Sequence, residues 1–235
     1  AATTYAVGFG GFFASIVILP LWLQSNMGYT ATWAGYATGI MGILAVLSAP
    51  FVGKACEKVD PRLIVCGGVL GLAGIMLWRM WEFNPDVTFG QMAWPMLLTG
   101  PFMVMFFVPV TGLAMSSVNH DEQANAAGLS NFMRTLAGAF ATSLVQSGWS
   151  NATRRNEGEI VNAMQHGRAA IDGMLAQGIP LDNAKAVLWQ VVEGQSVMLA
   201  TLNMFGVIAV CLGFSAMIIW LVPKPKGPID TSGAH

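Results

Sequence analysis

Charged residues are what this sequence has least of. Aspartate, glutamate, lysine and arginine make up 10% of its 235 residues, whereas an ordinary soluble domain contains about 25%. Hydrophobic residues account for 54%, and the mean hydropathy is positive. So few charges cannot coat a water-exposed surface, and the composition therefore predicts a membrane protein. The formal net charge of −1, with no block of like charges, also argues against a nucleic-acid partner.

Cysteine is equally scarce, and its spacing matches no metal site. Cys56, Cys66 and Cys211 form no CxxC pair, so we expect no disulfide framework. The sequence also lacks a Ser/His/Asp set, a P-loop and a dinucleotide-binding fingerprint. The stretch NHDEQ at 119–123 is interpreted as a solvated turn, because adjacent residues on a short loop do not converge on one ion. We therefore expect no catalytic residue, no metal and no cofactor, and do not interpret the protein as an enzyme.

Six apolar segments are long enough to cross a bilayer, which takes about 20 residues. They cover residues 4–23, 33–52, 63–80, 92–118, 124–147 and 197–222. The fold is predicted to be an all-α membrane protein with a bundle of six transmembrane helices. Its parts would be spans one to five (1–147), a periplasmic loop with short helices (148–196), span six (197–223) and a cytoplasmic tail (224–235). The chain begins almost inside its first span and without Met, which is typical of a piece of a longer protein.

Lysine and arginine set the expected orientation, because they concentrate in short cytoplasmic loops. Lys54, Lys58 and Arg62 lie between spans two and three, and two lysines follow span six, whereas Arg79 is assigned to the short loops of the opposite side. The C-terminus is therefore predicted to be cytoplasmic. The outer loop has apolar residues at helical spacing over 158–178 and 181–194, interrupted by GIP at 178–180. A packed lid is favoured there over a helix lying on the membrane or on a partner.

Arg134 stands in an otherwise small and apolar stretch, LSNFMRTLAGAF, of span five. A helical wheel separates this span into an apolar face and a polar face. The apolar face contains Leu129, Phe132, Met133, Leu136, Phe140 and Leu144. The polar face contains Ser130, Asn131, Arg134, Thr135, Gly138, Thr142 and Gln146. An arginine inside a membrane normally faces a bundle interior or a wet cavity. Two interpretations stay open. As a structural residue, Arg134 reaches the cytoplasmic interface or donates hydrogen bonds to helix carbonyls; as a functional one, it lines a transport pathway or braces its gate.

The functional interpretation names six cavity-lining candidates and two hinges. The cavity candidates are Asn131, Arg134, Thr135, Thr142 and Gln146 in span five and Asn203 in span six, although Asn203 equally suits a cross-link between helices. Pro101 and Pro109 are candidate hinges in span four. Two rows of glycine, one at 35, 39 and 42 and one at 67, 71 and 74, predict close helix packing. No Asp or Glu falls in the central part of a span, so a proton-coupling carboxylate would have to lie elsewhere.

Three motifs then carry a family resemblance. GYTATWAG (28–35), FFVPVTGLAM (106–115) and LSNFMRTLAGAFATS (129–143) resemble the second half of the EmrB-type, fourteen-span drug:proton antiporters of the major facilitator superfamily. The resemblance implies a C-terminal domain built as a 3+3 inverted repeat and working by alternating access. It implies export of lipophilic or amphiphilic compounds across a bacterial inner membrane in exchange for protons, and so a link to antibiotic resistance. It also implies that the N-terminal half of the carrier, a periplasmic adaptor and an outer-membrane channel are partners.

The stretch GKACEKVDPR at 53–62 resembles the repeated inner-loop signature of that superfamily. Gly53, Glu57, Lys58 and Arg62 keep the pattern, whereas Asp60 and Pro61 depart from it. We expect a weakened copy that orients the protein more than it latches a conformation. Two rival functions remain: a carrier of another substrate class, such as a sugar or an organic anion, and a non-transporting membrane scaffold or docking subunit that uses its outer loop.

Overall fold

The protein is all-helical in the computed structural model, which describes residues 2–84, 87–115, 123–163 and 167–220. The helices are α1 (Ala2–Ser25), α2 (Ala31–Gly39), α3 (Met41–Lys58), α4 (Pro61–Glu82), α5 (Phe89–Met115), α6 (Gln123–Ala163), α7 (Gly167–Ala176) and α8 (Leu181–Ile219). Strands are absent from these ranges. The predicted all-α fold is therefore confirmed.

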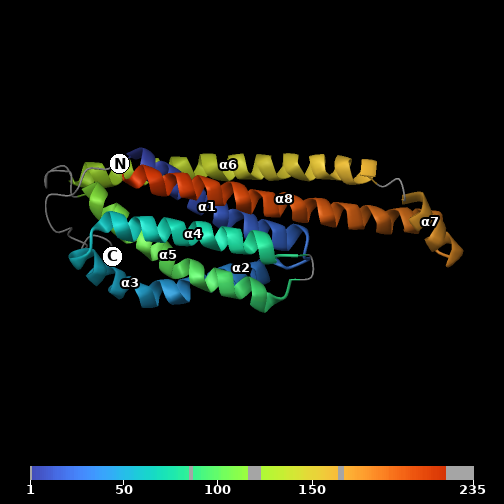
Figure 1. Cartoon of the computed structure of the whole chain (residues 1–235), viewed down its shortest axis with the longest axis horizontal. Coiled ribbons are helices and arrows are strands. Elements are labelled where there is room, and N and C mark those ends of the chain that lie inside the picture. Colours follow the sequence, from blue (N-terminus) through green and yellow to red (C-terminus); the bar gives the residue numbers. More distant parts are fainter. Residues whose placement is uncertain (1, 85–86, 116–122, 164–166, 221–235) are drawn as a thin grey trace.

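The long helices lie side by side in one elongated bundle (Figure 1). α3 packs on α5, α5 on α4 and α4 on α8, while α1 and α6 complete the bundle beside α8. The side chains of Phe9, Trp22, Phe106 and Phe205 are almost completely buried, and they come from α1, α5 and α8. α3 and α6 lie at opposite edges of the bundle (Figure 1).

Five helical segments are long and apolar enough to cross a membrane in the part of the chain that the structure describes. They are Gly8–Ser25, Ala31–Lys58, Pro61–Glu82, Phe89–Gly112 and Leu181–Ile219. The second joins α2 and α3, which are separated only by Ile40. The expected span at 124–147 lies within α6 and does not reach the same hydropathy, because its polar face carries residues such as Asn131, Arg134 and Gln146. α6 nevertheless packs along α1 and α8 as a member of the bundle.

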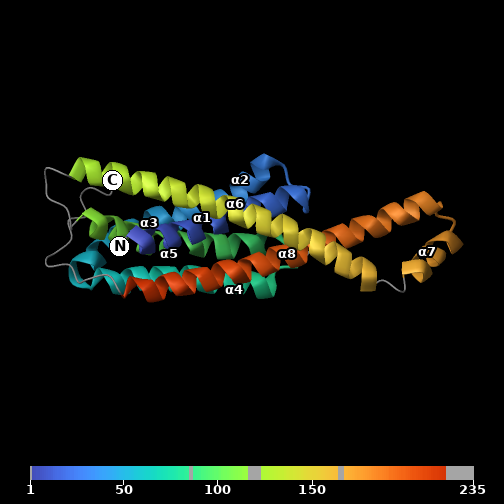
Figure 2. The ribbon, with the colours of Figure 1, turned by 90° about the horizontal axis from the view of Figure 1, so that it is seen from above.

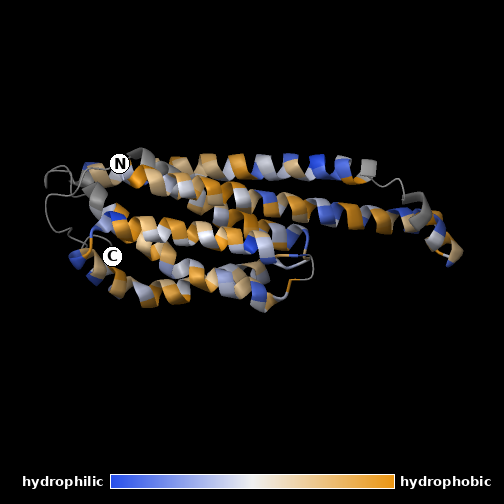
Figure 3. Cartoon of the chain, viewed as in Figure 1, coloured by the Kyte–Doolittle hydropathy of each residue, from blue (hydrophilic) through white to orange (hydrophobic). Residues whose placement is uncertain are grey.

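The expected outer loop, 148–196, is instead mostly helical. α6 has 41 residues and α8 has 39, so each is about 60 Å long, roughly twice the thickness of the hydrocarbon core. Both helices extend past the other long helices, with α7 at their far end (Figures 1 and 2). The projecting part of α6 is largely hydrophilic (Figure 3).

α6 continues beyond residue 147, and α8 begins well before residue 197. Side chains join the two helices near these positions. Trp149 Nε1 donates a hydrogen bond to Thr201 Oγ1 over 2.9 Å, and Asn156 Nδ2 donates to the Ser196 carbonyl over 3.3 Å. The break predicted at GIP is present, since Gly178 has a φ of +82°, and α8 begins directly after Pro180. Only a glycine adopts such a φ without strain.

The stretch 53–62 is also more helical than a loop signature implies. Gly53, Glu57 and Lys58 belong to α3, and Arg62 belongs to α4, so only two residues lie between the helices. Asp60 accepts a hydrogen bond from the Arg62 backbone N–H over 3.1 Å, and Pro61 occupies the first turn of α4. The two residues that depart from the loop pattern therefore start a helix, for which a capping acid and an N-terminal proline are well suited.

Candidate functional site

Arg134 is half-buried on the face of α6 that packs against α1. Its Nη2 donates to Asn131 Oδ1 over 2.6 Å, one turn earlier on the same helix. Its guanidinium carbon lies 5.8 Å from the centre of the Phe9 ring of α1, within the range of a cation–π contact. These contacts hold the guanidinium of Arg134 against α1 and away from the apolar face of α6.

A cluster of five phenylalanines lies beneath this arginine. Phe9, Phe12 and Phe13 come from α1, and Phe106 and Phe107 from α5. The ring centres of Phe9 and Phe107 are 4.5 Å apart, and those of Phe12 and Phe107 are 5.1 Å apart, both edge to face. Such pairs add to the stability of a packed interface. The site therefore combines one cation, a largely buried aromatic cluster beneath it and the polar side chains of α6.

The other candidates on α6 divide between its packed and open sides. Thr135 is exposed, and its hydroxyl donates to the Asn131 carbonyl over 2.9 Å. Thr142 is half-buried and Gln146 is exposed. Gly138 is buried, and a Cβ at this position would lie 3.1 Å from the Phe13 ring. The polar face thus extends from the α1 contact to a surface that this chain leaves uncovered.

Asn203 is not brought together with the polar face of α6. It is exposed on α8, on the same side as the exposed Leu199, Val207 and Val210. In the described ranges, the α8 hydroxyl that does bond to α6 is that of Thr201, two residues away. Residues two apart on a helix point in different directions, so Asn203 lies outside the site that Arg134 defines.

The candidate hinges lie in a single unbroken helix. α5 contains Pro95, Pro101 and Pro109 without an interruption. Next to Pro101, Gly100 lies so close to α3 that a Cβ would collide with the Met41 carbonyl oxygen. Whether these prolines act as hinges stays a prediction.

Arg62 belongs to the candidate conformational loop, and its side chain is buried. Its Nε and Nη2 have no hydrogen-bond partner within the described ranges, whereas Glu57 and Lys58 are exposed on α3. No ion pair joins Arg62 to Glu57 in the described part of the chain. A latching role for this stretch stays a prediction.

Arg79 is a buried arginine that the sequence interpretation had assigned to a loop. It belongs to α4, and only 1% of its surface is exposed. Its Nη2 contacts Met96 Sδ at 3.0 Å and Thr99 Oγ1 at 3.4 Å, both on α5, and its guanidinium carbon lies 5.9 Å from the Phe205 ring centre. Helical spacing contained the signal, because Arg79 follows the buried Leu72 and Met76 at intervals of seven and three residues.

Acidic side chains are absent from the middle of the bundle in the ranges described. Glu57, Asp60 and Glu82 lie at or beside the ends of helices, and Glu157, Glu159 and Glu193 lie where α6 and α8 project. Glu193 is part of α8 and exposed. The stretch NHDEQ lies almost entirely outside the described residues, as does the tail at 224–235. The described bundle therefore offers cations and aromatic rings, with no carboxylate beside them.

Comparison with known proteins identifies related chains. Residues 1–142 match the model of the Major Facilitator Superfamily. The multidrug export protein EmrB of Escherichia coli K12 is 32% identical over 224 residues, which cover 92% of this chain and 43% of EmrB. The fatty acid resistance protein FarB of Neisseria gonorrhoeae is 37% identical over 148 residues, or 63% of this chain and 29% of FarB. The chain thus spans less than half the length of these curated relatives.

Proposed function

The chain belongs to the major facilitator superfamily, and from that premise we propose that it is the C-terminal six-helix half of a proton-coupled multidrug exporter. The exporter would move lipophilic or amphiphilic compounds by alternating access in a bacterial inner membrane. The observation that carries the proposal is the position of Arg134 above Phe9, beside an α6 surface that is polar and open. Aromatic walls with a few polar groups suit amphiphilic ligands.

The uncovered surfaces of the bundle support the presence of a second half. In the span formed by α2 and α3, only 11% of the apolar stretch is buried within this chain. In the span of α1, 56% of the apolar stretch is buried. No atom of the described residues lies within 4 Å of a Cβ position at Gly35, Gly39 or Gly42. Because glycine rows let membrane helices approach closely, we assign them to a helix from the rest of the carrier. By contrast, Gly71 of the other row already packs against Phe102.

Proton coupling is assigned to the rest of the carrier. The described spans have no carboxylate near Arg134, and a carboxylate is the group that usually titrates in such carriers. Lys54 and Lys58 lie in the last turns of α3, and such basic residues favour a cytoplasmic position for that end of the bundle. The C-terminus is proposed to lie on the same side. The projecting ends of α6 and α8 would then reach into the periplasm, where a periplasmic adaptor and an outer-membrane channel are the proposed partners.

A carrier of organic anions is the second candidate. The positive charge of Arg134 would serve as the counter-ion for such a substrate, and the name of one relative refers to fatty acid resistance. A non-transporting scaffold is the third, and for it the projection of α6, α7 and α8 would be the active surface. The three candidates predict different results in one transport assay.

The proposal is tested with the complete carrier in proteoliposomes. We expect an imposed pH gradient to drive lipophilic cations and neutral lipophiles across the membrane, with collapse of the gradient by an ionophore as the control. Movement of carboxylate compounds alone would favour the organic-anion carrier. Absence of any gradient-driven movement would contradict transport and leave the scaffold.

A further inference from the structure

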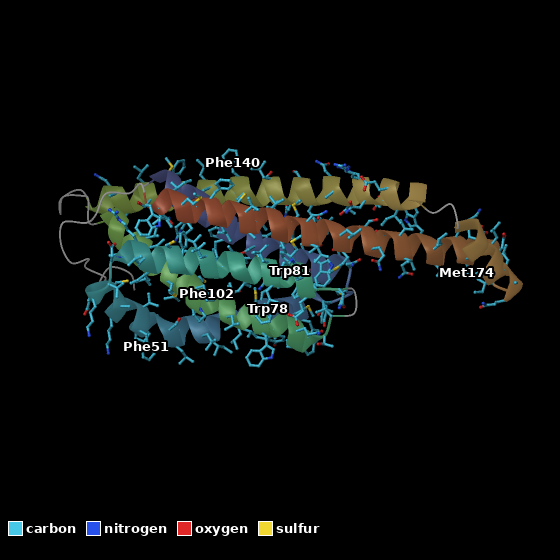
Figure 4. The ribbon with its side chains drawn as sticks, viewed as in Figure 1. Phe51, Trp78, Trp81, Phe102, Phe140 and Met174 are labelled. Carbon is cyan, nitrogen blue, oxygen red and sulfur yellow. The ribbon has the colours of Figure 1, made fainter. Side chains whose placement is uncertain are left out.

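We propose that Arg79 forms an internal binding site for a monovalent anion between α4, α5 and α8. The side chain is 99% buried, as follows from its exposure of 1%. It lies one turn before the end of α4, between Trp78 and Trp81, which Figure 4 labels at that end of the helix. The site is on another helix from Arg134, and the proposed transport site does not use it.

The charge of Arg79 is not balanced by a carboxylate of the described residues. Arg155 and Glu159 form an exposed ion pair on α6, and Arg79 forms no ion pair with a residue of the described ranges. Even Glu82, one turn further along α4, does not lie within ion-pairing distance of it. An uncompensated buried charge is strongly unfavourable, and arginine cannot escape the cost by losing its proton. An anion from solution would remove this imbalance.

The neighbours of the guanidinium are neutral and weak acceptors. Met96 offers a thioether sulfur, which is a poor hydrogen-bond acceptor. Thr99 offers a hydroxyl oxygen at 3.4 Å, whose own proton is donated to the Pro95 carbonyl over 2.8 Å. These contacts orient Nη2 toward α5, and the Phe205 ring lies 5.9 Å from the guanidinium carbon. They fix the group without neutralising it.

One unused donor of this group is Nε, which is buried and has no hydrogen-bond partner among the described residues. A halide or a carboxylate oxygen matches a single N–H donor of a cation, and such charge-assisted bonds are stronger than neutral ones. The surrounding side chains are apolar, so the attraction is little screened. Arg79 is three residues from the end of α4, which corresponds to a rise of about 5 Å along the helix axis. An anion that enters at this end of the helix therefore has a short path to Arg79.

Thermal unfolding of the complete purified carrier tests the site. At equal ionic strength, chloride is expected to raise the unfolding midpoint by about 1–3 °C over gluconate, because an anion that binds only the folded state stabilises it. Gluconate serves as the reference because its polyhydroxylated chain is poorly suited to a site between apolar side chains. In a chloride-free buffer, decanoate is compared with decanol, which has the same chain length and no charge. If only chloride raises the unfolding midpoint, the site binds an inorganic anion. If only decanoate raises it, the site binds a carboxylate headgroup.

Arg79→Met provides the decisive variant, because methionine keeps the bulk of the side chain and removes the charge. We expect it to fold and to lose the anion response, whereas the exposed-arginine control Arg154→Met keeps it. A wild-type midpoint that is the same in every anion, or a response that survives in Arg79→Met, would overturn the site. If Arg79→Met does not fold, anomalous scattering from wild-type crystals decides, with bromide as the probe for an inorganic anion and a bromine-labelled decanoate as the probe for a carboxylate. Maps without density for either probe at the Arg79 guanidinium also overturn the site.

Discussion

Replacing Arg134 by alanine in the complete carrier is expected to lower drug efflux about tenfold or more while leaving membrane insertion intact. The substitution removes a charge-assisted hydrogen bond to Asn131 and the cation above Phe9. Because the proposed role places the guanidinium on the transport pathway, its removal also deletes a charge-assisted contact to substrate or cavity water. Hydrogen bonds to charged groups contribute about 1.5–3 kcal/mol, and 1.4 kcal/mol corresponds to a factor of ten. Removal of a charge from a span favours insertion. Efflux of a fluorescent lipophilic cation from cells, at matched expression, measures the effect.

The chain contains a closely matched control for this substitution. Arg154 makes the same contact as Arg134, since its Nη2 donates to Asn151 Oδ1 three residues earlier over 2.6 Å. It lies exposed on the same helix, 20 residues further along the chain. Arg154→Ala should therefore leave efflux nearly unchanged, and Arg134→Lys should restore part of it by keeping the charge. Equal efflux by wild type and Arg134→Ala would contradict the functional role and leave the arginine as a structural residue.

Gly100→Ala is expected to lower the stability of the carrier strongly. A Cβ at this position would collide with the Met41 carbonyl oxygen and lie 2.8 Å from the Ala45 backbone nitrogen. Both atoms belong to the backbone of α3, which cannot turn aside as a side chain can. Overpacking of this kind costs about 1–3 kcal/mol or more. Thermal unfolding in detergent, followed by size-exclusion chromatography, should give a midpoint several degrees lower and less monodisperse protein.

Gly74→Ala is the matched control, because it places the same methyl group in the interior of a neighbouring helix. In the part of the chain that the structure describes, no atom lies within 4 Å of a Cβ at Gly74, and alanine is favoured over glycine in a helix by about 1 kcal/mol. Its midpoint should equal or exceed that of the wild type. Similar midpoints for the Gly100 and Gly74 variants would show that α3 and α5 do not approach each other as closely as described.

The two arginines show how far the sequence could be interpreted. Arg134 was visible because it interrupts an apolar stretch well inside a span, and the structure places it against Phe9. Arg79 was missed because it lies near the end of a span, between two tryptophans, where arginines commonly reach the interface. Its burial depends on Met96, Thr99 and Phe205. These residues come from two other helices, and their approach is set by tertiary packing that periodicity along one helix does not report.

The projection of α6 and α8 was underestimated for a related reason. Hydropathy marks where a helix leaves the membrane, but it does not mark where the helix ends. Residues 148–163 and 181–196 are polar enough to be interpreted as a loop, yet they belong to α6 and α8. The hydrogen bond from Asn156 to the Ser196 carbonyl joins the two helices in this region. The break at Gly178 was predictable, since glycine followed by proline interrupts a helix through local sterics alone.

The central claim is that the polar side of α6 faces a water-filled cavity between two halves of a carrier. Thr135→Cys and Leu136→Cys test it directly, because both side chains are exposed in this chain and lie at nearly the same depth, about 100° apart on the helix. In a complete carrier with Cys56, Cys66 and Cys211 changed to serine, each is treated with a membrane-impermeant thiol reagent. The account predicts that Thr135→Cys reacts, more slowly when substrate is present, and that Leu136→Cys stays unmodified in lipid. Equal modification of the two, or modification of Leu136→Cys alone, would contradict it.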